Sequence, residues 1–243
     1  MYIKTNRGIK VTKEQALSKL QLNPRLLQIA KLVPNCKAVA DIGTDHGYIP
    51  IFSVLAGLCN QAIASDINKG PIKRAGENVK LFCLEDKISL RLGGGLETVE
   101  AGEADVVVIA GMGGILISDI LEKSKDVVMA AKHLILQPMT AAGELREYLC
   151  QSSFNVTKEV LVAEDEKLYS IICVDVGGKC EYSPKDLLLG KNVEETEPGL
   201  FEENRKRVIQ KLEKRLAGLE KSVVPENACQ AQRVRELLEL VNK

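Results

Sequence analysis

Five short apolar runs alternate with segments of helical periodicity between residues 38 and 150, and this alternation constrains the fold most strongly. The runs are predicted strands, and they lie at Ala38–Ile42, Gln61–Asp66, Ile88–Leu92, Asp105–Ala110 and His133–Gln137. Strands that are linked through helices pair in parallel, so helices cover both faces of their sheet. We therefore predict an α/β fold with helices near residues 49–57, 71–84, 114–129 and 142–150.

The segments on either side of this region follow other patterns. Residues Thr12–Leu20 and Pro24–Val33 have apolar side chains at helical spacing and are predicted helices. Asn155–Ala163 and Leu168–Val176 are predicted strands joined by four polar residues, a link so short that only an antiparallel hairpin is permitted. Five parallel units closed by a hairpin resemble the Rossmann-like sheet of class I methyltransferases and differ from the sheet of dehydrogenases.

The glycines and lysine at 177–179 mark a predicted boundary between two domains. Residues 1–180 are expected to form the α/β domain. In residues 181–243, apolar side chains recur at three- and four-residue steps from Val208 to Val223 and again from Val234 to Val241. This spacing predicts a C-terminal helical hairpin with a coiled-coil-like seam that packs on itself.

The net charge is zero, yet the charges are unevenly distributed along the chain. Residues 1–40, which include the expected basic helical segment 1–37, carry eight Lys or Arg and one Glu. Residues 41–180 carry thirteen basic and twenty acidic side chains. Polyanions bind to local patches, so the zero average does not exclude a nucleic-acid partner. Ordinary solvated helix faces carry similar charges, and the pattern alone leaves both interpretations open.

Several features favour a cytoplasmic protein. Seven cysteines lack the C-x-x-C spacing and only two histidines are present, so we expect reduced thiols and no metal site. The sequence contains no run of 18 apolar residues, and its first residues lack the apolar core of a secretory signal. We accordingly expect no membrane partner, and we expect the protein to be a monomer.

The candidate cofactor site follows the first predicted strand, where the sequence is Asp41-Ile42-Gly43-Thr44-Asp45-His46-Gly47. A glycine turn at the carboxyl end of a parallel strand lets the backbone approach a ligand closely. Asp41 is expected either to anchor this loop or to meet an ammonium group of the ligand. The sequences G-x-G-x-x-G and G-K-[ST] are absent, so neither a dinucleotide nor a nucleoside triphosphate is implied.

Two further features extend this site. Asp66 ends the second predicted strand, 23 residues after Gly43, close to the spacing at which a carboxylate accepts ribose hydroxyls. Its alternative role is to cap the following turn. The run Gly93-Gly94-Gly95-Leu96 follows the third strand and is expected to lie against a planar ring, with a bare loop as the alternative.

Candidate substrate contacts follow the other strands. The fourth strand leads into Ala110-Gly111-Met112-Gly113-Gly114, and the fifth ends at Gln137, whose amide can read a base edge. His46 and Tyr48 follow the first strand, where a histidine contacts substrate or braces the loop.

Taken together, D-I-G-T-D-H-G-Y-I-P (41–50), A-S-D-I-N-K-G-P (64–71), I-A-G-M-G-G (109–114) and L-I-L-Q-P (134–138) resemble the bacterial tRNA adenine-22 N1-methyltransferases, the TrmK family. The first motif departs from the general methyltransferase pattern D-x-G-x-G-x-G at its middle glycine and agrees with this family's version. The resemblance implies methylation of N1 of adenine 22 in tRNA with S-adenosyl-L-methionine as cofactor.

On this basis the candidate cofactor-binding residues are Asp41, Gly43, Thr44, Gly47, Asp66, Ile67, Gly94, Gly95, Leu96, Ala110, Gly111 and Met112. Asp45, Gln137 and His46 are the candidate catalytic residues. Candidate substrate-binding residues are Tyr48, Gly113, Lys10, Lys13 and Lys19. Two alternatives remain open at this point: a methyltransferase for another RNA base or a small molecule, and a non-catalytic RNA-binding scaffold with a vestigial methyltransferase fold. A dehydrogenase is disfavoured by the missing third glycine and by the terminal hairpin.

Overall fold

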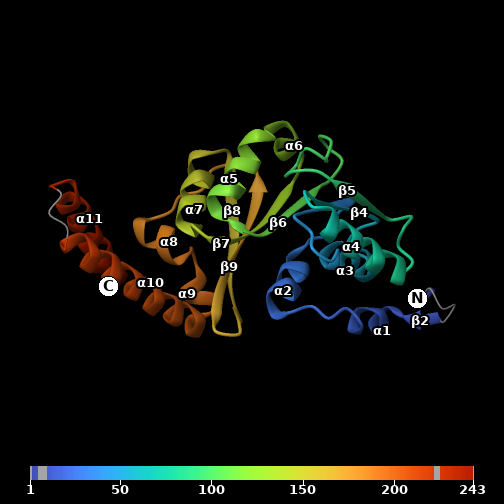
Figure 1. Cartoon of the computed structure of the whole chain (residues 1–243), viewed down its shortest axis with the longest axis horizontal. Helices are drawn as coiled ribbons and strands as arrows, with labels where there is room; N and C mark the ends of the chain where they lie inside the picture. The colour runs from blue at the N-terminus through green and yellow to red at the C-terminus, as the bar shows by residue number, and fades with distance from the viewer. Residues whose placement is uncertain (1, 5–9, 222–224, 243) are drawn as a thin grey trace.

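A seven-stranded mixed sheet runs through the middle of the molecule (Figure 1). The computed structural model describes residues 2–4, 10–221 and 225–242. In the sheet the strands lie in the order β5-β4-β3-β6-β7-β9-β8. Their bounds are Ala38–Ile42 (β3), Gln61–Asp66 (β4), Ile88–Leu92 (β5), Val106–Gly113 (β6), His133–Thr140 (β7), Phe154–Glu164 (β8) and Lys167–Val176 (β9). The strands β3 to β7 pair in parallel, and β8 and β9 close the sheet as an antiparallel hairpin.

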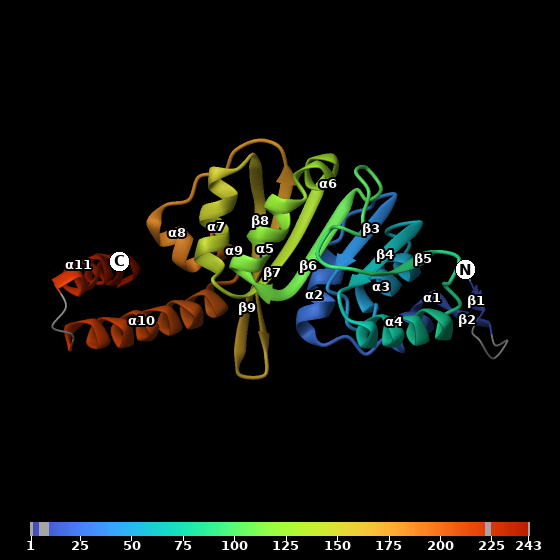
Figure 2. The same cartoon turned by 45° about the horizontal axis from the view of Figure 1, so that its top comes forward.

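Helices cover both faces of the sheet (Figure 2). One core joins the sheet to α2 (Pro24–Leu32), α3 (Tyr48–Ala56) and α4 (Lys69–Leu81), and a second joins it to α5 (Gly114–Lys123), α6 (Lys125–Ala130) and α7 (Ala142–Gln151). All five residues of β3 are buried, as expected for a parallel strand that is covered on both sides. The predicted Rossmann-like α/β fold with its terminal hairpin is confirmed.

The structure corrects three predicted elements. The segment 1–37 is not purely helical, because β1 (Tyr2–Lys4) pairs antiparallel with β2 (Lys10–Thr12) ahead of the short helix α1 (Lys13–Ser18). The helix predicted over 114–129 is two helices, since the backbone of Ser124 leaves helical geometry between α5 and α6. Strands β6 and β7 continue three residues beyond their predicted ends, and this extension shapes the site described below.

The strand order reverses between β3 and β6. From β3 the chain proceeds outward through β4 to β5, and it then returns to the other side of β3 with β6 and β7. The loops that follow β3 and β6 therefore diverge and leave a crevice at the carboxyl ends of these two strands. Ligands of open α/β sheets bind at such a reversal.

Beyond the sheet, the chain is helical. The elements are α8 (Pro184–Leu189), α9 (Val193–Thr196), α10 (Pro198–Glu220) and α11 (Pro225–Asn242). Helices α10 and α11 pack against each other and extend away from the sheet (Figure 2). A third core joins Leu161 of β8 to apolar side chains of this region, including Phe201, Leu212 and Val234.

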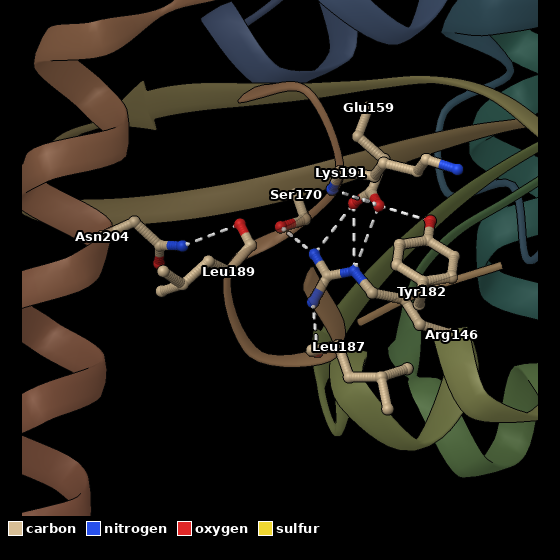
Figure 3. Close-up of polar contacts among 8 residues, drawn as sticks. All are labelled: Arg146, Glu159, Ser170, Tyr182, Leu187, Leu189, Lys191 and Asn204. Carbon is tan, nitrogen blue, oxygen red and sulfur yellow. Dashed lines mark hydrogen bonds and ion pairs between the residues drawn. The ribbon is translucent and has the colours of Figure 1, made fainter. Parts of the chain in front are cut away.

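A buried ion pair fastens the helical region to the sheet (Figure 3). The guanidinium of Arg146 on α7 bonds to the carboxylate of Glu159 on β8, and both side chains are about 98% buried or more. Arg146 also donates to the carbonyl of Leu187 at 2.9 Å. Glu159 accepts from the Tyr182 hydroxyl and from the backbone N–H of Lys191 at 3.1 Å. The chain between β9 and α10 is therefore held by charge-assisted hydrogen bonds out of water.

Candidate active site

Two open cavities lie at the carboxyl ends of the strands, on either side of Gly43. The Asp66 cavity has a volume of about 370 Å³ and is lined by Asp66, Ile67, the glycines 93–95, Leu96 and Met112, among others. The Tyr48 cavity has a volume of about 400 Å³ and is lined by residues that include Arg25, Asp41, Asp45, His46, Tyr48 and Gly111. Gly43 lines both cavities, so the two form adjoining halves of one site.

The junction between the cavities requires glycine. Gly43 has a φ of +79°, and a Cβ atom at this position would lie 2.3 Å from Cε of Met112. Any larger residue would have to adopt a left-handed backbone that side chains rarely allow, and it would displace the end of the methionine side chain. The backbone of the loop is thus shaped for close approach of a ligand that reaches across it.

In the Asp66 cavity, one oxygen of Asp66 accepts a hydrogen bond from the backbone N–H of Asn68 at 2.7 Å. Asp66 therefore does cap the turn that follows β4, which was the alternative role predicted from the sequence. A carboxylate has a second oxygen, which can accept a ribose hydroxyl at the same time.

The same cavity has apolar surfaces suited to a planar ring. Ile67 is 70% exposed at the cavity, which is unusual for a large aliphatic residue, whereas Leu96, which also lines the cavity, is buried. A Cβ atom at Gly95 would lie 3.3 Å from the side chain of Ile120, so the glycine run brings its backbone close to α5. A ligand ring lying in this cavity would remove Ile67 from water.

The carboxyl of Asp41 lies at the floor of the Tyr48 cavity and is only 5% exposed. Burial raises its pKa from 3.8 to about 6, although a hydrogen bond from Thr44 opposes the shift. Thr44 also accepts from the backbone N–H of Gly47 at 3.2 Å, which closes the loop. A buried carboxyl of this kind is stabilised by a ligand cation, such as the ammonium of an amino acid.

The mouth of the Tyr48 cavity holds three polar or aromatic side chains. The rings of His46 and Tyr48 stack with centroids 5.1 Å apart and planes inclined by 14°. The carboxylate of Asp45 is exposed, lies 3.3 Å from Nε2 of His46 and is paired with Arg74 of α4. Asp45 therefore presents an exposed carboxylate at this mouth, and one of its oxygens is ion-paired with the guanidinium of Arg74.

Gln137 differs from its expected role. The side chain is fully buried. Its carbonyl oxygen accepts from Nη1 of Arg25 at 2.7 Å and from the backbone N–H of Gly111 at 3.2 Å, and its amide donates to the carbonyl of Pro138 at 2.9 Å. The amide that was expected to read a base edge is thus engaged within the protein, because α2 and β6 supply the donors for its oxygen and its own strand accepts from its nitrogen.

Arg25 reaches this point from the start of α2. Its guanidinium lies 5.3 Å from the ring centroid of Tyr169, and Nε lies 3.9 Å from Glu164 at the end of β8. Glu164 also accepts from the backbone N–H of Arg25 at 3.0 Å. Within the described chain, the buried Nε–H makes no hydrogen bond, an arrangement that costs roughly 1–3 kcal/mol.

The remaining candidates are placed as follows. Lys19 is exposed on the segment that leads to the cavity wall, and the side chains of Lys10 and Lys13 lie outside the described residues. Gly113 lies at the end of β6 opposite Thr140 of β7. In the described ranges, no group of His, Cys, Asp and Glu side chains could hold a metal ion, and no helix is long and apolar enough to span a bilayer.

Arg25, Arg74 and Glu164 were not anticipated from the sequence. Arg74 meets Asp45 across 29 positions, and Glu164 meets Arg25 across 139. No local spacing reports contacts over such separations. The one available signal was that Arg25 directly follows Pro24 at the start of a predicted helix, in the basic segment.

The crevice at the strand reversal, its glycine loop and its acidic strand ends define a Rossmann-like methyltransferase domain. A family model described as a methyltransferase domain matches residues 22–172. The tRNA (adenine(22)-N(1))-methyltransferase of Bacillus subtilis (strain 168) is 40% identical over 163 residues, which cover 67% of this chain and 68% of that protein. The chain therefore belongs to the tRNA adenine-22 N1-methyltransferases, the TrmK family.

Two solved structures agree over nearly the whole chain. The crystal structure of the B. subtilis m1A22 tRNA methyltransferase TrmK has a TM-score of 0.84 and 32% identity, covering 92% of this chain and 98% of that one. The structure of M. capricolum TrmK with S-adenosyl-homocysteine has a TM-score of 0.78 and 27% identity, covering 91% and 96%. Both the sheet and the C-terminal helices are thus shared with these proteins.

Proposed function

We propose that this protein transfers a methyl group from S-adenosyl-L-methionine to N1 of adenine 22 in tRNA. One observation carries the proposal: two cavities adjoin at Gly43, one lined by a ribose-type carboxylate and the other by a buried carboxyl and a stacked aromatic pair. A nucleoside cofactor and a target base that occupied these cavities would meet at the junction. Family membership supplies the particular base and RNA.

The cofactor would lie across the junction. Asp66 would accept ribose hydroxyls, while the adenine ring would rest between Ile67 and the segment Gly94, Gly95 and Leu96. Asp41 would meet the methionine ammonium in the loop formed by Gly43, Thr44 and Gly47. The backbone from Ala110 through Gly111 to Met112 would complete the wall. The fit is supported by the left-handed glycine turn at Gly43, which lines both cavities, and by the buried Asp41 carboxyl, which a bound cation would stabilise.

S-adenosylmethionine supplies an electrophilic methyl group on a sulfonium. Adenine N1 owns a free lone pair at neutral pH, so no base is needed to remove a proton before attack. The protein's own contribution is to hold the adenine in line and to stabilise the positive charge that develops on it. We assign the second task to Asp45, with His46 holding the carboxylate at the mouth.

The target nucleotide must leave its base-paired or stacked position, because N1 lies on the Watson–Crick edge. Tyr48, which stacks on His46, would receive the extruded base, and Gly113 at the end of β6 would contact the same nucleotide. Lys10, Lys13 and Lys19 would contact tRNA phosphates. These roles explain why the basic segment leads directly into the cavity wall at Gln21 and Arg25.

We further propose that the chain acts as a cytoplasmic monomer made of a methyltransferase domain (1–180) and a helical domain (181–243). Seven free cysteines fit a reducing compartment. Static light scattering of the purified protein, alone and with tRNA, tests the oligomeric state: one protein mass per complex is expected, and a dimer would contradict the proposal.

The decisive experiment incubates the full chain with S-adenosylmethionine and an unmodified tRNA that carries either A22 or G22. Mass spectrometric mapping should locate one N1-methyladenine at position 22 of the first tRNA and no methylation of the second. Equal methylation of both RNAs, or modification at another base, would refute the assigned target.

Two variants test the assigned residues in the same assay. Asp66→Ala should weaken cofactor binding about 10- to 100-fold, since a charge-assisted hydrogen bond is lost, whereas Asp86→Ala at the opposite edge of the sheet should have no effect. Asp45→Ala should lower kcat about tenfold at unchanged cofactor affinity. Calorimetry measures the affinities, and unchanged binding by the Asp66 variant would overturn the ribose assignment.

A further inference from the structure

A chain of hydrogen bonds that passes through Arg25 connects four elements distant in the sequence, namely β8, α2, β7 and β6. Glu164 at the end of β8 holds the backbone of Arg25 at the start of α2, and Nη1 of Arg25 donates to Gln137 of β7. The Gln137 carbonyl in turn accepts from the backbone N–H of Gly111 in β6. Hydrogen bonds of 3.0, 2.7 and 3.2 Å therefore connect the wall of the Tyr48 cavity to the end of β6.

The last of these bonds fixes a peptide at the reaction site. The peptide between Ala110 and Gly111 lines the Tyr48 cavity, and Gly111 has a φ of +79°. Its N–H points to Gln137, and because a trans peptide directs N–H and C=O to opposite sides, the Ala110 carbonyl is directed away from Gln137. The orientation of this carbonyl thus depends on which way the Gln137 amide is held.

Arg25 determines how that amide is held. An amide side chain can turn over and exchange its oxygen for its NH₂ group, which cannot accept from Gly111. Arg25 offers only donors, so it bonds to the oxygen and keeps the oxygen facing both itself and Gly111. The guanidinium is in turn held over Tyr169 and beside Glu164.

We propose that Arg25 is a positioning residue for methyl transfer: through Gln137 it fixes the Ala110–Gly111 peptide, which lies in the wall shared by the methionine end of the cofactor and the target adenine. The inference rests on the proposed function, since it assigns the Tyr48 cavity to the base. It requires no contact between Arg25 and the methyl group. A displacement of about 1 Å in a reacting pair lowers the rate about 100-fold, so loss of this alignment is measurable.

Kinetics of the full chain with tRNA test the proposal. Arg25→Gln should lower kcat about 10- to 100-fold and leave both KM for tRNA and the affinity for S-adenosylmethionine within about twofold of wild type. Arg25→Lys, which can still donate to Gln137, should recover most of the lost rate. Lys132→Gln, which breaks an ion pair with Asp105 at the opposite edge of the sheet, serves as control. A loss confined to KM, or no recovery by lysine, would overturn the assignment.

A double-mutant cycle tests the route through Gln137. If Arg25 acts through this amide, Arg25→Gln combined with Gln137→Ala should be no slower than Gln137→Ala alone. Multiplicative losses would show that Arg25 acts by another path and would refute the proposal. Thermal unfolding of each variant identifies any that fail to fold, and Arg25→Lys keeps the comparison informative.

A measurement without cofactor or RNA separates this inference from the proposed function. Hydrogen exchange of the Gly111 amide, followed by NMR on the ¹⁵N-labelled protein, should accelerate at least tenfold in Arg25→Gln and remain unchanged in Lys132→Gln. An unchanged exchange rate of the Gly111 amide would refute the proposed coupling from Arg25 through Gln137 to Gly111, even if the enzyme were active. If the wild type failed to methylate A22 while exchange of the Gly111 amide accelerated in Arg25→Gln, the proposed function would be refuted and the coupling from Arg25 to Gly111 would be supported.

Discussion

At the scale of single residues, Asp41 is the group whose chemistry depends most on burial. Its carboxyl is desolvated at the floor of the site, so its pKa is raised to about 6. A raised carboxyl pKa means that the folded protein favours the protonated form. The stabilising contribution of Asp41 is therefore fully present below pH 3.8 and is lost as the pH rises through about 6.

This titration predicts pH-dependent cofactor binding. A methionine ammonium favours the ionised Asp41, so the affinity for S-adenosylmethionine should fall about tenfold between pH 7.5 and pH 5. Asp41→Asn should bind more weakly at pH 7.5 and show little change over this range. Calorimetry across the range measures both, and a flat profile in the wild type would exclude Asp41 as the partner of the ammonium.

The residue scale is also where sequence reasoning was least complete. Asp41, Asp66 and Gly43 could be found because each stands at a strand end in a local motif, and the structure brings them to the two cavities. The burial of Gln137 could not be predicted from the sequence, because it depends on contacts with Arg25 of α2 and with the backbone of Gly111 in β6. The partnership of Arg25 with Glu164 depends on how α2 packs beside the hairpin tip, which no local pattern records.

At the scale of elements, the start of α5 is fixed by a close backbone contact. A Cβ atom on Gly114 would lie 2.1 Å from the carbonyl oxygen of Ala141, which precedes α7. This oxygen belongs to the backbone and cannot rotate away as a flexible side chain would. The Gly111–Gly114 segment, singled out from its glycines, therefore has a packing reason as well as a place in the site.

Gly114→Ala should consequently destabilise the protein by about 1–3 kcal/mol, the usual cost of overpacking. Gly218→Ala in the exposed last turn of α10 meets no atom within 4 Å and should stabilise by at most about 0.5–1 kcal/mol, since alanine favours a helix. Urea denaturation gives both free energies of unfolding. Equal stabilities for the two variants would contradict the contact described here.

The buried network around Glu159 joins four elements at once, namely α7, β8, β9 and α8. Glu159→Ala should lower the free energy of unfolding by about 3–5 kcal/mol, because it leaves the Arg146 guanidinium buried without its counter-ion. Glu203→Ala, which removes an exposed pair with Arg207 on α10, should cost less than about 1 kcal/mol. Chemical denaturation distinguishes these values, and similar losses would show that burial of the pair is unimportant.

At the scale of the whole molecule, the net charge is zero but the N-terminal segment is basic and the sheet region is acidic. The basic N-terminal segment adjoins the Tyr48 cavity through Gln21 and Arg25. Zero net charge therefore says little about RNA binding, as the uneven sequence distribution indicated. Fold class was predictable at this scale because the alternation of strands and helices determines the sheet, whereas the antiparallel pair β1–β2 was missed because each strand has only three residues.

Replacing Lys10, Lys13 and Lys19 by glutamate should weaken tRNA binding about 10- to 100-fold and leave cofactor binding unchanged. The slope of log affinity against log salt should decrease by about 2 to 3 if each lysine meets a phosphate. A variant with Lys87, Lys132 and Lys179 replaced by glutamate has the same charge change at the opposite edge of the sheet. Filter binding over a salt series compares the two, and equal weakening would mean that only total charge matters.

Gly43 lies between two cavities that each open to solvent. In the proposed binding mode the cofactor extends into both, because its ammonium would meet Asp41 in the cavity that also receives the base. Cofactor and base would therefore share the Tyr48 cavity, and we expect the cofactor to bind before the RNA. A side chain at position 43 would collide with the end of Met112 at the junction and hinder this order of entry.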